Sequence, residues 1–346
     1  MAGAGGLLHV WAARGLLAWL MWPLSLLFGA VTATRRGLYR RGLLRSQAVA
    51  VPVVVVGNLI AGGAGKTPVV MALLASLRAR GLTPGIVSRG YGANVDGTLE
   101  ITRTTRATES GDEPLLLHLR TGAPVVVGRD RVAAARKLLE RHPQVDIIVS
   151  DDGLQHLRLA RDAQVIVFDE RGVGNGWLLP AGPLRERLPR TLPARTLVVY
   201  NASTPSTPLP GTLARRGLRG VVGLAEWWVG GPATMTAMHA LQGRPLVAAA
   251  GVANPDRFFA MLRDCGLTIE PMPRPDHDPF TTLPWPSDTA DVVVTEKDAI
   301  KLDAARVGRT RVWVAPLDFA LDAAFDAALF ALLPPPGSRY DGNSLA

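Results

Sequence analysis

The segment GNLIAGGAGKTP, residues 57–68, combines residue types that bind phosphate. Its glycines allow backbone N–H groups to turn toward an anion, and the helix expected after it adds the positive end of its dipole. In such a loop Lys66 is expected to reach the β- and γ-phosphates of a nucleotide, while the Thr67 hydroxyl holds Mg²⁺. The predicted nucleotide-binding loop consists of Gly62, Gly63, Ala64, Gly65, Lys66 and Thr67.

This loop departs from the usual pattern Gly-x-x-x-x-Gly-Lys-[Ser/Thr], because Ile60 stands where the first glycine is expected. Its setting is nevertheless that of a phosphate-binding loop. The β-branched run at 49–58 predicts a buried parallel strand, and 65–81 predicts a helix closed by Gly81. The alternative is a glycine-rich turn without a ligand. The dimerising ATPases that position partners on membranes carry lysine at the place of Ile60, so the loop argues against that class.

A phosphate-binding loop also needs an acidic residue at the end of a neighbouring strand. DIIVSDDG offers Asp151 and Asp152, whereas VIVFDERG offers Asp169. Sequence position alone does not choose between them, and a strand-end aspartate is common in turns. The double acid is the richer candidate, because Gln155 and His156 follow it in GLQH.

Two further segments supply candidate bases for a phosphoryl transfer. ESGDEPLLLHLR places Asp112 and Glu113 at the start of a short predicted helix. The alternative reading is that Asp112 caps this helix, with Pro114 in its first turn, and both roles are compatible. RPDHDPF contributes Asp276 and His277, although a single histidine in a loop is more often simply solvated.

Predicted strands and helices alternate along the chain, which indicates a parallel sheet covered by helices. The expected fold is α/β, with a P-loop NTPase-like parallel-sheet domain, a smaller second α/β domain and an N-terminal membrane helix. The single cysteine, Cys265, excludes an internal disulfide and a cysteine-built metal site. The predicted divisions are a membrane anchor with a basic flank at 1–45, the P-loop domain at 46–200, a connecting segment at 201–234, the second domain at 235–335 and a disordered tail at 336–346.

The net charge of +9 is concentrated near the N-terminus, since ten Lys and Arg residues and no acidic residue precede Asp96. The stretch 15–34 carries no charge and is long enough for a helix to cross a bilayer. Five arginines follow it within 35–45, which places that flank on the cytoplasmic side. The alternatives are a signal peptide, which the basic flank disfavours, and a buried core helix. Whether the helix spans the membrane or lies in its interface stays open.

Nine motifs in one order make the chain similar to a known family. They are VPVVVVGNLIAGGAGKTP, GIVSRGYG, GDEPLLL, VGRDR, SDDGLQH, NGWLLPAGPLRE, GVANPDRFF, PDHDPF and VVVTEKDAIKL, between about residues 51 and 302. Together they resemble tetraacyldisaccharide 4'-kinase, the lipid A kinase of Gram-negative bacteria. The resemblance implies transfer of the γ-phosphate of ATP to the 4'-hydroxyl of a tetraacylated glucosamine disaccharide 1-phosphate, which gives lipid IVA. It further implies the cofactors ATP and Mg²⁺ and a place at the inner membrane, with the catalytic domains on the cytoplasmic face.

The resemblance also assigns roles to residues. Lys66 is implied to bind phosphate, and Asp112 is implied to be the catalytic base, helped by His277. The pair Asp151 and Asp152 is implied to serve the metal, with Gln155 and His156 nearby. The family has two lobes, so Asp112 and His277 are expected on different lobes, which predicts closure of the cleft between them. The sequence departs from the family at Asp278 and Pro279, where an aromatic residue is frequent.

The remaining expectations concern partners and rivals. Arg89, in a glycine turn, is a candidate contact for phosphate or headgroup, and the alternative is a surface arginine. The lipid disaccharide and the inner-membrane lipids are the expected partners, with no nucleic acid and no obligate protein partner. The rival function is a membrane-associated P-loop ATPase or GTPase that acts as a switch. TEKD, at 295–298, is the nearest match to the guanine motif Asn-Lys-x-Asp. A basic tether that binds nucleic acid is a second rival, without a recognisable nucleic-acid fold.

Overall fold

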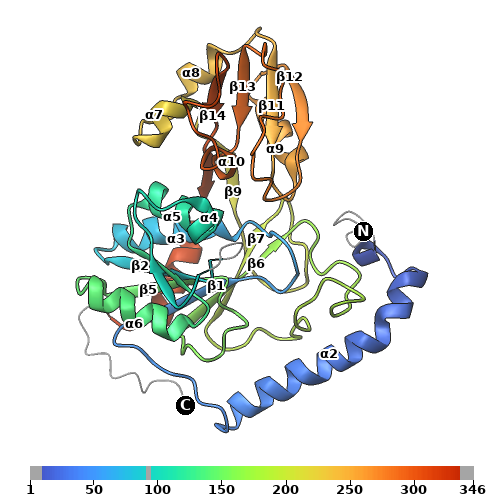
Figure 1. Cartoon of the computed structure of the whole chain (residues 1–346). Helices are drawn as coiled ribbons and strands as arrows, with labels where there is room; N and C mark the ends of the chain where they lie inside the picture. The colour runs from blue at the N-terminus through green and yellow to red at the C-terminus, as the bar shows by residue number, and fades with distance from the viewer. Residues whose placement is uncertain (1–9, 91–94, 336–346) are drawn as a thin grey trace. The chain divides into compact units, whose positions relative to one another are not determined.

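The computed structural model describes residues 10–90 and 95–335 (Figure 1). The predicted tail at 336–346 lies outside the described residues. By its contacts the chain forms two compact units, which are described separately. The first comprises Met1–Arg89, Pro124–Ala214 and Leu321–Ala346, and the second comprises Gly90–Ala123 and Arg215–Ala320. The predicted boundaries at 45, 200 and 235 stay predictions.

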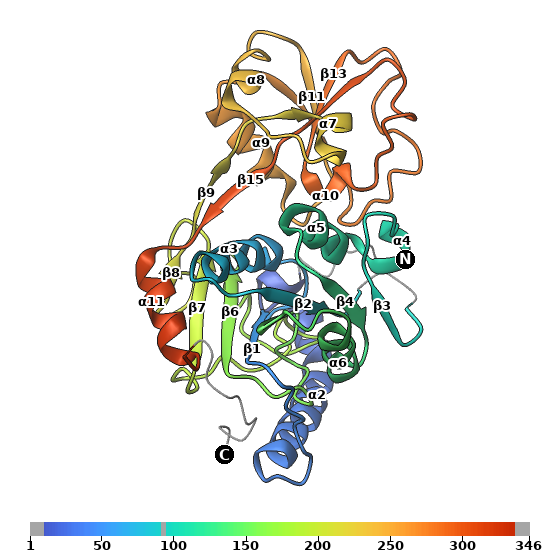
Figure 2. The same ribbon diagram turned by 90° about the vertical axis from the view of Figure 1, so that its left-hand side faces the viewer.

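The first unit is built on a parallel sheet, as the alternation of elements predicted. Its strands are β1 (Val53–Gly57), β2 (Pro84–Ser88), β4 (Val125–Gly128), β5 (Ile147–Asp151), β6 (Ala163–Asp169), β7 (Thr196–Asn201) and β8 (Thr212–Leu213). Its helices are α2 (Leu16–Arg40), α3 (Lys66–Ala79), α6 (Arg131–Arg141) and α11 (Ala323–Leu332). The strands lie in the order β4-β2-β5-β1-β6-β7-β8, and their pairings are parallel. Helix α11 lies beside β7 (Figure 2).

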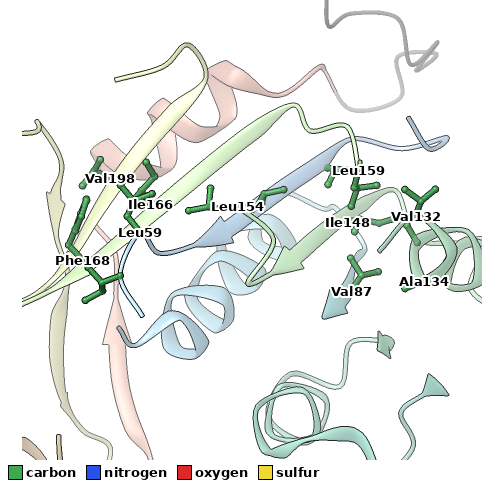
Figure 3. Packing of buried hydrophobic residues seen from close by; sticks show 14 of the residues in the cluster. Leu59, Val87, Val132, Ala134, Ile148, Leu154, Leu159, Ile166, Phe168 and Val198 are labelled. Atoms are coloured by element: carbon green, nitrogen blue, oxygen red, sulfur yellow. The ribbon is translucent and has the colours of Figure 1, made fainter. Parts of the chain in front are cut away.

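Both faces of this sheet are covered, which is why β1 reads as a continuous apolar run rather than an alternating one. Val53 and Val55 belong to a buried cluster with Val132 and Leu138 of α6. Figure 3 shows part of this cluster, with Val132 and Ala134 of α6 labelled. The alternate side chains of β1 point to the opposite face, because strand side chains have a period of two. Helix α3 contacts β1 and β5 and buries an apolar stripe that includes Leu73.

The order of the strands decides where a ligand can meet the sheet. β1 lies between β5 and β6, with Val56 opposite Asp151 and Gly57 opposite Ile166. The segments that follow these three strands therefore leave the sheet at one edge. In open parallel sheets, ligands bind at the carboxyl ends of the strands where the order reverses. The GAGKT loop and the acidic turns at 151–152 and 169 all lie at this edge.

The second unit contains its own smaller sheet, in the order β10-β14-β13-β11-β12. The strands β11, β12, β13 and β14 pair in parallel, and β10 joins β14 antiparallel. These strands are β10 (Val222–Gly223), β11 (Leu246–Ala250), β12 (Ile269–Pro273), β13 (Asp291–Val294) and β14 (Arg311–Val314). The helices are α4 (Ala107–Ser110), α5 (Asp112–Thr121), α7 (Leu224–Trp228), α8 (Met235–His239), α9 (Pro255–Asp264) and α10 (Glu296–Ala299).

Three short strands complete the second unit. β9 (Arg215–Leu218) and β15 (Leu317–Ala320) form an antiparallel ribbon, and β3 spans Thr98–Glu100. The region 201–234, predicted to be connecting structure, thus holds β8, β9, β10 and α7 as well as turns. Its Pro- and Gly-rich composition hid these elements, because each is five residues or shorter.

Candidate active site

The predicted phosphate loop joins β1 to α3, as expected. Gly62 and Gly65 have φ values of 89° and 74°, in the left-handed region that glycine adopts without strain. Gly65 is the N-cap of α3, which begins at Lys66. A Cβ at position 65 would lie 1.9 Å from Nδ2 of Asn201, so a larger residue there would displace that side chain. The loop therefore presents its backbone and the first turn of α3 at the edge of the sheet.

Ile60 occupies the position of the missing glycine because its side chain is part of the core. It is fully buried, and its backbone forms an isolated antiparallel bridge with Leu184. The backbone next to Ile60 is held by the chain around Leu184 as well. The N–H of Ala61 donates to the carbonyl of Pro183 at 2.7 Å. The first half of the loop is thus fixed by packing and pairing.

Lys66 is buried at the start of α3, with 8% of its surface exposed. Its Nζ lies 3.3 Å from Oδ1 of Asn58 and 3.5 Å from Oδ1 of Asp152. The Nδ2 of Asn58 donates to the carbonyls of Ile60 and Gly62, at 2.8 and 3.2 Å. Asn58 therefore links the conformation of the loop to the position of the Lys66 ammonium group. Sequence reasoning assigned no role to Asn58, although it is the polar residue that ends the apolar strand.

The structure separates the two acidic candidates that the sequence left open. Asp152 lies against Lys66, whereas Asp169 binds Arg171, with Oδ2 and Nη2 2.7 Å apart. Arg171 in turn donates to the carbonyl of Gly63. Asp169 thus supports the loop indirectly, and Asp152 directly faces its lysine.

Asp152 lies in a cluster of cations that the sequence did not reveal. Burial alone raises the pKa of Asp152, but Lys66, Arg185 and Arg131 outweigh it and hold that pKa below its usual value. Arg185 Nη1 lies 3.2 Å from Oδ1 of Asp152. Arg131 is 3% exposed and donates from Nη2 to the Asp152 carbonyl at 3.3 Å. Burial lowers the pKa of Arg131 to about 10, so it remains a cation at neutral pH. Both arginines stand in motifs that the sequence singled out, VGRDR and NGWLLPAGPLRE.

Gln155 and His156, the other residues of this motif, also lie in the first unit. Gln155 donates from Nε2 to the carbonyl of Asn58 at 3.3 Å and accepts from Arg185 at 3.4 Å. Burial, followed by repulsion from Arg131, lowers the pKa of His156 to about 4, so its ring is neutral at pH 7. Gln155 connects the acidic turn to the phosphate loop, and His156 feels the charge of Arg131.

Two predicted contacts sit at the margins of this cluster. Thr67 is half-buried in the first turn of α3. Arg89 follows β2 directly and is exposed. Its positive charge lowers the pKa of Arg131, although burial and the charges of Asp151 and Asp152 each have a larger effect on that pKa. Both residues are at the same edge of the sheet as the loop, because β2 is parallel to β5.

The second candidate cluster, in the second unit, is centred on Asp112. Asp112 is the first residue of α5, and the N-cap is Gly111, which offers no side-chain cap. The alternative reading of Asp112 as the cap is therefore wrong. Its Oδ2 instead lies 3.1 Å from Nδ1 of His277 and 3.4 Å from Nζ of Lys301. Burial raises the pKa of Asp112, yet the hydrogen bond from His277 and the charges of Lys301 and Lys297 lower it further, so it is a carboxylate at neutral pH.

The prediction that Asp112 and His277 lie on different lobes is also wrong. Both residues belong to the second unit, since the segment Gly90–Ala123 clusters with Arg215–Ala320. Their contact spans 165 positions of sequence and exists within one compact body. Closure of two lobes is therefore not needed to bring these two side chains together.

Helix α5 is held on α10 by pairs of opposite charge along its length (Figure 2). At its start, Lys297 Nζ lies 3.3 Å from Oε1 of Glu113. At its end, Arg120 pairs with Glu296, which also accepts from Trp227 Nε1 at 3.0 Å. These contacts fix the direction of α5 and therefore the position of Asp112. Glu113, predicted beside Asp112 as a candidate active-site or substrate contact, is in this structure a partner of Lys297.

Lys297 and Lys301, in TEKDAIKL, are the residues of this cluster that sequence reasoning missed. Lys301 is 5% exposed by its side chain and also contacts Oδ1 of Asp298 at 3.4 Å. Two lysines four positions apart in the motif VVVTEKDAIKL were the available signal. Nothing local in the sequence indicated that α5, about 180 residues earlier, packs against them.

The loop that carries His277 has a defined shape despite its departure from the family pattern. Asp278 accepts from Arg274 Nε at 2.9 Å and from the backbone N–H of Phe280 at 2.9 Å. The side chain of Asp278 therefore closes the turn. His277 itself has φ of 61°, which is uncommon for a residue with a side chain. Asp152 shares this feature with φ of 50°, so both candidate clusters contain a constrained backbone position.

The comparisons with known proteins identify the family of the chain. The profile of the tetraacyldisaccharide-1-P 4'-kinase family, LpxK, matches residues 17–334. The chain belongs to this family. The tetraacyldisaccharide 4'-kinase of Methylibium petroleiphilum is 57% identical over 337 residues, covering 96% of this chain and 94% of the relative. That of Leptothrix cholodnii is 55% identical, covering 94% and 95%.

A solved structure extends the likeness to the fold. The crystal structure of LpxK from Aquifex aeolicus in complex with ATP matches with a TM-score of 0.75 and 26% identity, covering 92% of this chain and 100% of that chain. The family resemblance and the α/β fold predicted from the motifs are thereby confirmed. The roles predicted for individual side chains stay predictions.

The side chains of this kinase fit the Mg²⁺ ion that ATP chemistry requires. Mg²⁺ prefers oxygen ligands and retains waters, so it uses one or two carboxylates together with substrate phosphates. Asp151, Asp152 and Thr67 offer such oxygens around the start of α3. Oδ2 of Asp151 accepts a hydrogen bond from Ser88 at 3.2 Å, which orients the carboxylate. Within residues 10–90 and 95–335 no group of three or more His, Cys, Asp or Glu side chains is placed to hold a metal.

Among the residues that the structure describes, one helix of the kinase is long and apolar enough to meet a membrane. Over α2 the mean hydropathy reaches 1.8 in an 18-residue window, of which 11% is buried. The core helix of a soluble protein and a signal sequence can share this length and composition. Ser25 anchors α2 to the first unit: its Oγ donates to the carbonyl of Leu178 at 2.8 Å and accepts from the N–H of Ala181 at 2.9 Å. Its exposed large side chains include Leu16, Leu17, Trp19, Leu20, Leu24, Leu27 and Val31.

Proposed function

We propose that this kinase transfers the γ-phosphate of ATP to the 4'-hydroxyl of a tetraacylated glucosamine disaccharide 1-phosphate, with lipid IVA as the product. The observation that carries the proposal is the match to the tetraacyldisaccharide 4'-kinase family over nearly the whole chain. The geometry supports a phosphoryl transfer, because a buried lysine and a backbone loop stand at the strand edge where nucleotides bind in parallel sheets.

In this proposal the nucleotide is held by the segment Gly62–Thr67. Its backbone N–H groups and the first turn of α3 attract phosphate oxygens, and Lys66 adds a positive charge. Thr67, Asp151 and Asp152 would hold Mg²⁺, which neutralises charge on the phosphates when it is bound. With a nucleotide present, Lys66 would exchange part of its contact with Asp152 for phosphate, while Arg185 continues to neutralise that aspartate.

Asp112 is the proposed base. Its pKa lies below the usual value for the reasons given above, so the carboxylate is available at neutral pH. A sugar hydroxyl is a very weak acid, so the proton is expected to move late, when bonding of the oxygen to phosphorus has made it acidic.

The place of action follows from the substrate in this proposal. A lipid with four acyl chains stays in its bilayer, so the enzyme must work at the surface of the inner membrane. Helix α2 would insert its exposed leucines, while Arg35, Arg40 and Arg41 would contact anionic headgroups on the cytoplasmic side. Arg36 is engaged with Glu186 within the first unit.

The test is the transfer of labelled γ-phosphate to the disaccharide 1-phosphate in detergent micelles. The wild type is expected to label the lipid, and Asp112→Ala to lower kcat by about 10²- to 10⁴-fold, the usual contribution of a general base. Asp288→Ala, at an exposed aspartate of the second unit, is the matched control and should retain full activity. Nucleotide hydrolysis without lipid labelling would instead support the rival switch ATPase.

A further inference from the structure

The phosphate loop is flanked by two pairs of opposite charge, one on each side. On the side of β5, Lys66 Nζ lies 3.5 Å from Oδ1 of Asp152. On the side of β6, Arg171 Nη2 lies 2.7 Å from Oδ2 of Asp169. Because β1 lies between β5 and β6, the two pairs approach the loop from opposite directions. The first pair belongs to the proposed site for phosphate and Mg²⁺, whereas the second has no part in it.

The guanidinium group of Arg171 is held along its edge. Its Nε lies 2.9 Å from Oδ2 of Asp169, and its backbone N–H donates to Oδ1 of the same carboxylate at 3.0 Å. Nη2 donates to the carbonyl of Gly63, and Nη1 would lie 3.3 Å from a Cβ on Gly62. The donors of a guanidinium group lie in its plane. The side chain keeps 35% of its surface exposed, and with its edge engaged the flat faces are what it can offer to a ligand.

Arg171 lies on the outer side of the loop, away from the amides that face phosphate. It accompanies Asn201, the last residue of β7, which is buried and donates from Nδ2 to the carbonyl of Ala64 at 3.1 Å. Side chains that follow or end β6 and β7 therefore occupy the carbonyls of Gly63 and Ala64. A loop whose carbonyls are bound on the outside keeps its N–H groups turned toward an anion on the inside.

The direction of a bound nucleotide follows from the other side of the loop. The lysine and the metal ligands of a phosphate loop mark the β- and γ-phosphates. Asp151 and Asp152 end and follow β5, so the terminal phosphates belong on that side. The chain leaves β1 toward β2, while β6 lies on the opposite side of β1, which puts the crevice of the switch point between the ends of β1 and β6. The nucleoside half then extends toward β6, where Arg171 lies.

We propose that Arg171 is a nucleotide-binding residue, whose guanidinium group stacks on the adenine ring of ATP and holds the nucleoside half in this crevice. An arginine stacks on aromatic faces, and a purine offers a large one. Because Asp169 and Gly63 already hold the guanidinium group, little side-chain entropy is lost when the ring binds. This inference rests on the proposed function for the identity of the nucleotide, but the contact can be measured without the lipid.

The variants separate a contact with adenine from support of the loop. Arg171→Gln should weaken binding of Mg-ADP about tenfold, the size of one stacking contact with a base. Binding of Mg-pyrophosphate should be unaltered, because it uses the loop amides and Lys66 alone. Arg171→Lys keeps the charge but not the flat surface and should behave like Arg171→Gln. Arg219→Gln, which breaks an exposed ion pair with Asp318 in the second unit, is the matched control and should leave both affinities unaltered.

The experiment is calorimetric titration of the full chain in detergent micelles with Mg-ADP and with Mg-pyrophosphate. Retained affinity for pyrophosphate shows that a variant is folded and that its loop is intact. Equal loss of affinity for both ligands would assign Arg171 to the support of the loop and overturn the proposal. Unaltered ADP affinity in Arg171→Gln, or full ADP affinity in Arg171→Lys, would overturn it as well.

Activity distinguishes this proposal from the proposed function. A contact made equally in the ground state and the transition state affects KM and not kcat, so Arg171→Gln should raise KM for ATP about tenfold during lipid phosphorylation. A lower kcat at saturating ATP would place Arg171 at the reacting phosphate and contradict the proposal. If no lipid is phosphorylated although the affinities change as expected, the assigned reaction fails and the adenine contact stands. If the wild type does not bind Mg-ADP, both fail.

Discussion

The substitution Gly65→Ala tests whether the Asn201 side chain, which fills the space beside Gly65, helps to hold the phosphate loop. Gly65 and Gly81 flank the same helix, α3, with similar φ values of 74° and 80°. A Cβ on Gly65 would lie 1.9 Å from Nδ2 of Asn201, whereas a Cβ on Gly81 would meet no atom within 4 Å. Gly81→Ala is therefore a control that changes backbone conformation without a collision.

The expected magnitudes follow from these two environments. Alanine in the left-handed region costs about 1–2 kcal/mol, and both variants carry this cost. At position 65 the Asn201 side chain must also move, which breaks its hydrogen bond of 3.1 Å to the Ala64 carbonyl. Loss of the partner of a buried polar group costs about 1–3 kcal/mol. We therefore expect Gly81→Ala to lower the free energy of unfolding by about 1–2 kcal/mol, and Gly65→Ala by about 1–3 kcal/mol more.

The assay is guanidinium denaturation of the full chain in micelles, followed by tryptophan fluorescence, with the slopes compared to check that the unfolding transition is the same. A double-mutant cycle with Asn201→Ala isolates the collision, because the truncated side chain no longer occupies the space of the new Cβ. The double variant should be less destabilised than the sum of the two single variants by about 1 kcal/mol or more. Equal costs at positions 65 and 81, or strict additivity in the cycle, would refute the reasoning.

Two further predictions concern other parts of the first unit. His156 has a pKa of about 4 in the folded chain, against an ordinary value of 6.5. Between these two pH values the unfolded chain therefore binds more protons than the folded chain. The free energy of unfolding should fall as the pH drops from about 6.5 toward 4. Denaturation midpoints across this range should show a smaller decline for His156→Gln, and an unchanged decline would contradict the assignment. Ser25→Ala removes two hydrogen bonds between α2 and the segment 178–181 and should cost about 1–3 kcal/mol, with faster amide exchange at Ala181. Thr32→Ala, whose hydroxyl bonds only carbonyls of its own helix, should leave that exchange unchanged.

The first unit illustrates what could be predicted from the sequence. The apolar run before GNLIAGGAGKTP, the glycines and the helix closed by Gly81 are local signals, and the structure has β1, the loop and α3 where they were expected. The alternation of strands and helices likewise gave a parallel sheet, because a sheet buried on both faces requires continuous apolar strands. Nine colinear motifs identified the family, since their order constrains far more positions than one loop does.

The tertiary structure alone decided which side chains meet. Whether Asp152 or Asp169 faces Lys66 depends on the partners that each finds at the same sheet edge, and both end strands of similar pattern. The assignment of Asp112 to a different lobe from His277 failed because chain order was taken as a guide to packing. Helix α5 is inserted in sequence between β2 and β4 of the first unit but pairs its charges with α10 of the second.

The sequence by itself therefore determined the elements, the phosphate loop and the family, because periodicity, turn residues and motif order are carried by neighbouring residues. The tertiary structure decided the pairing of Asp112 with His277 and of Glu113 with Lys297, and the anchoring of α2 through Ser25. The physical reason is that a hydrogen bond or an ion pair depends on a few ångströms of separation, and the packing of segments up to 184 residues apart sets that separation.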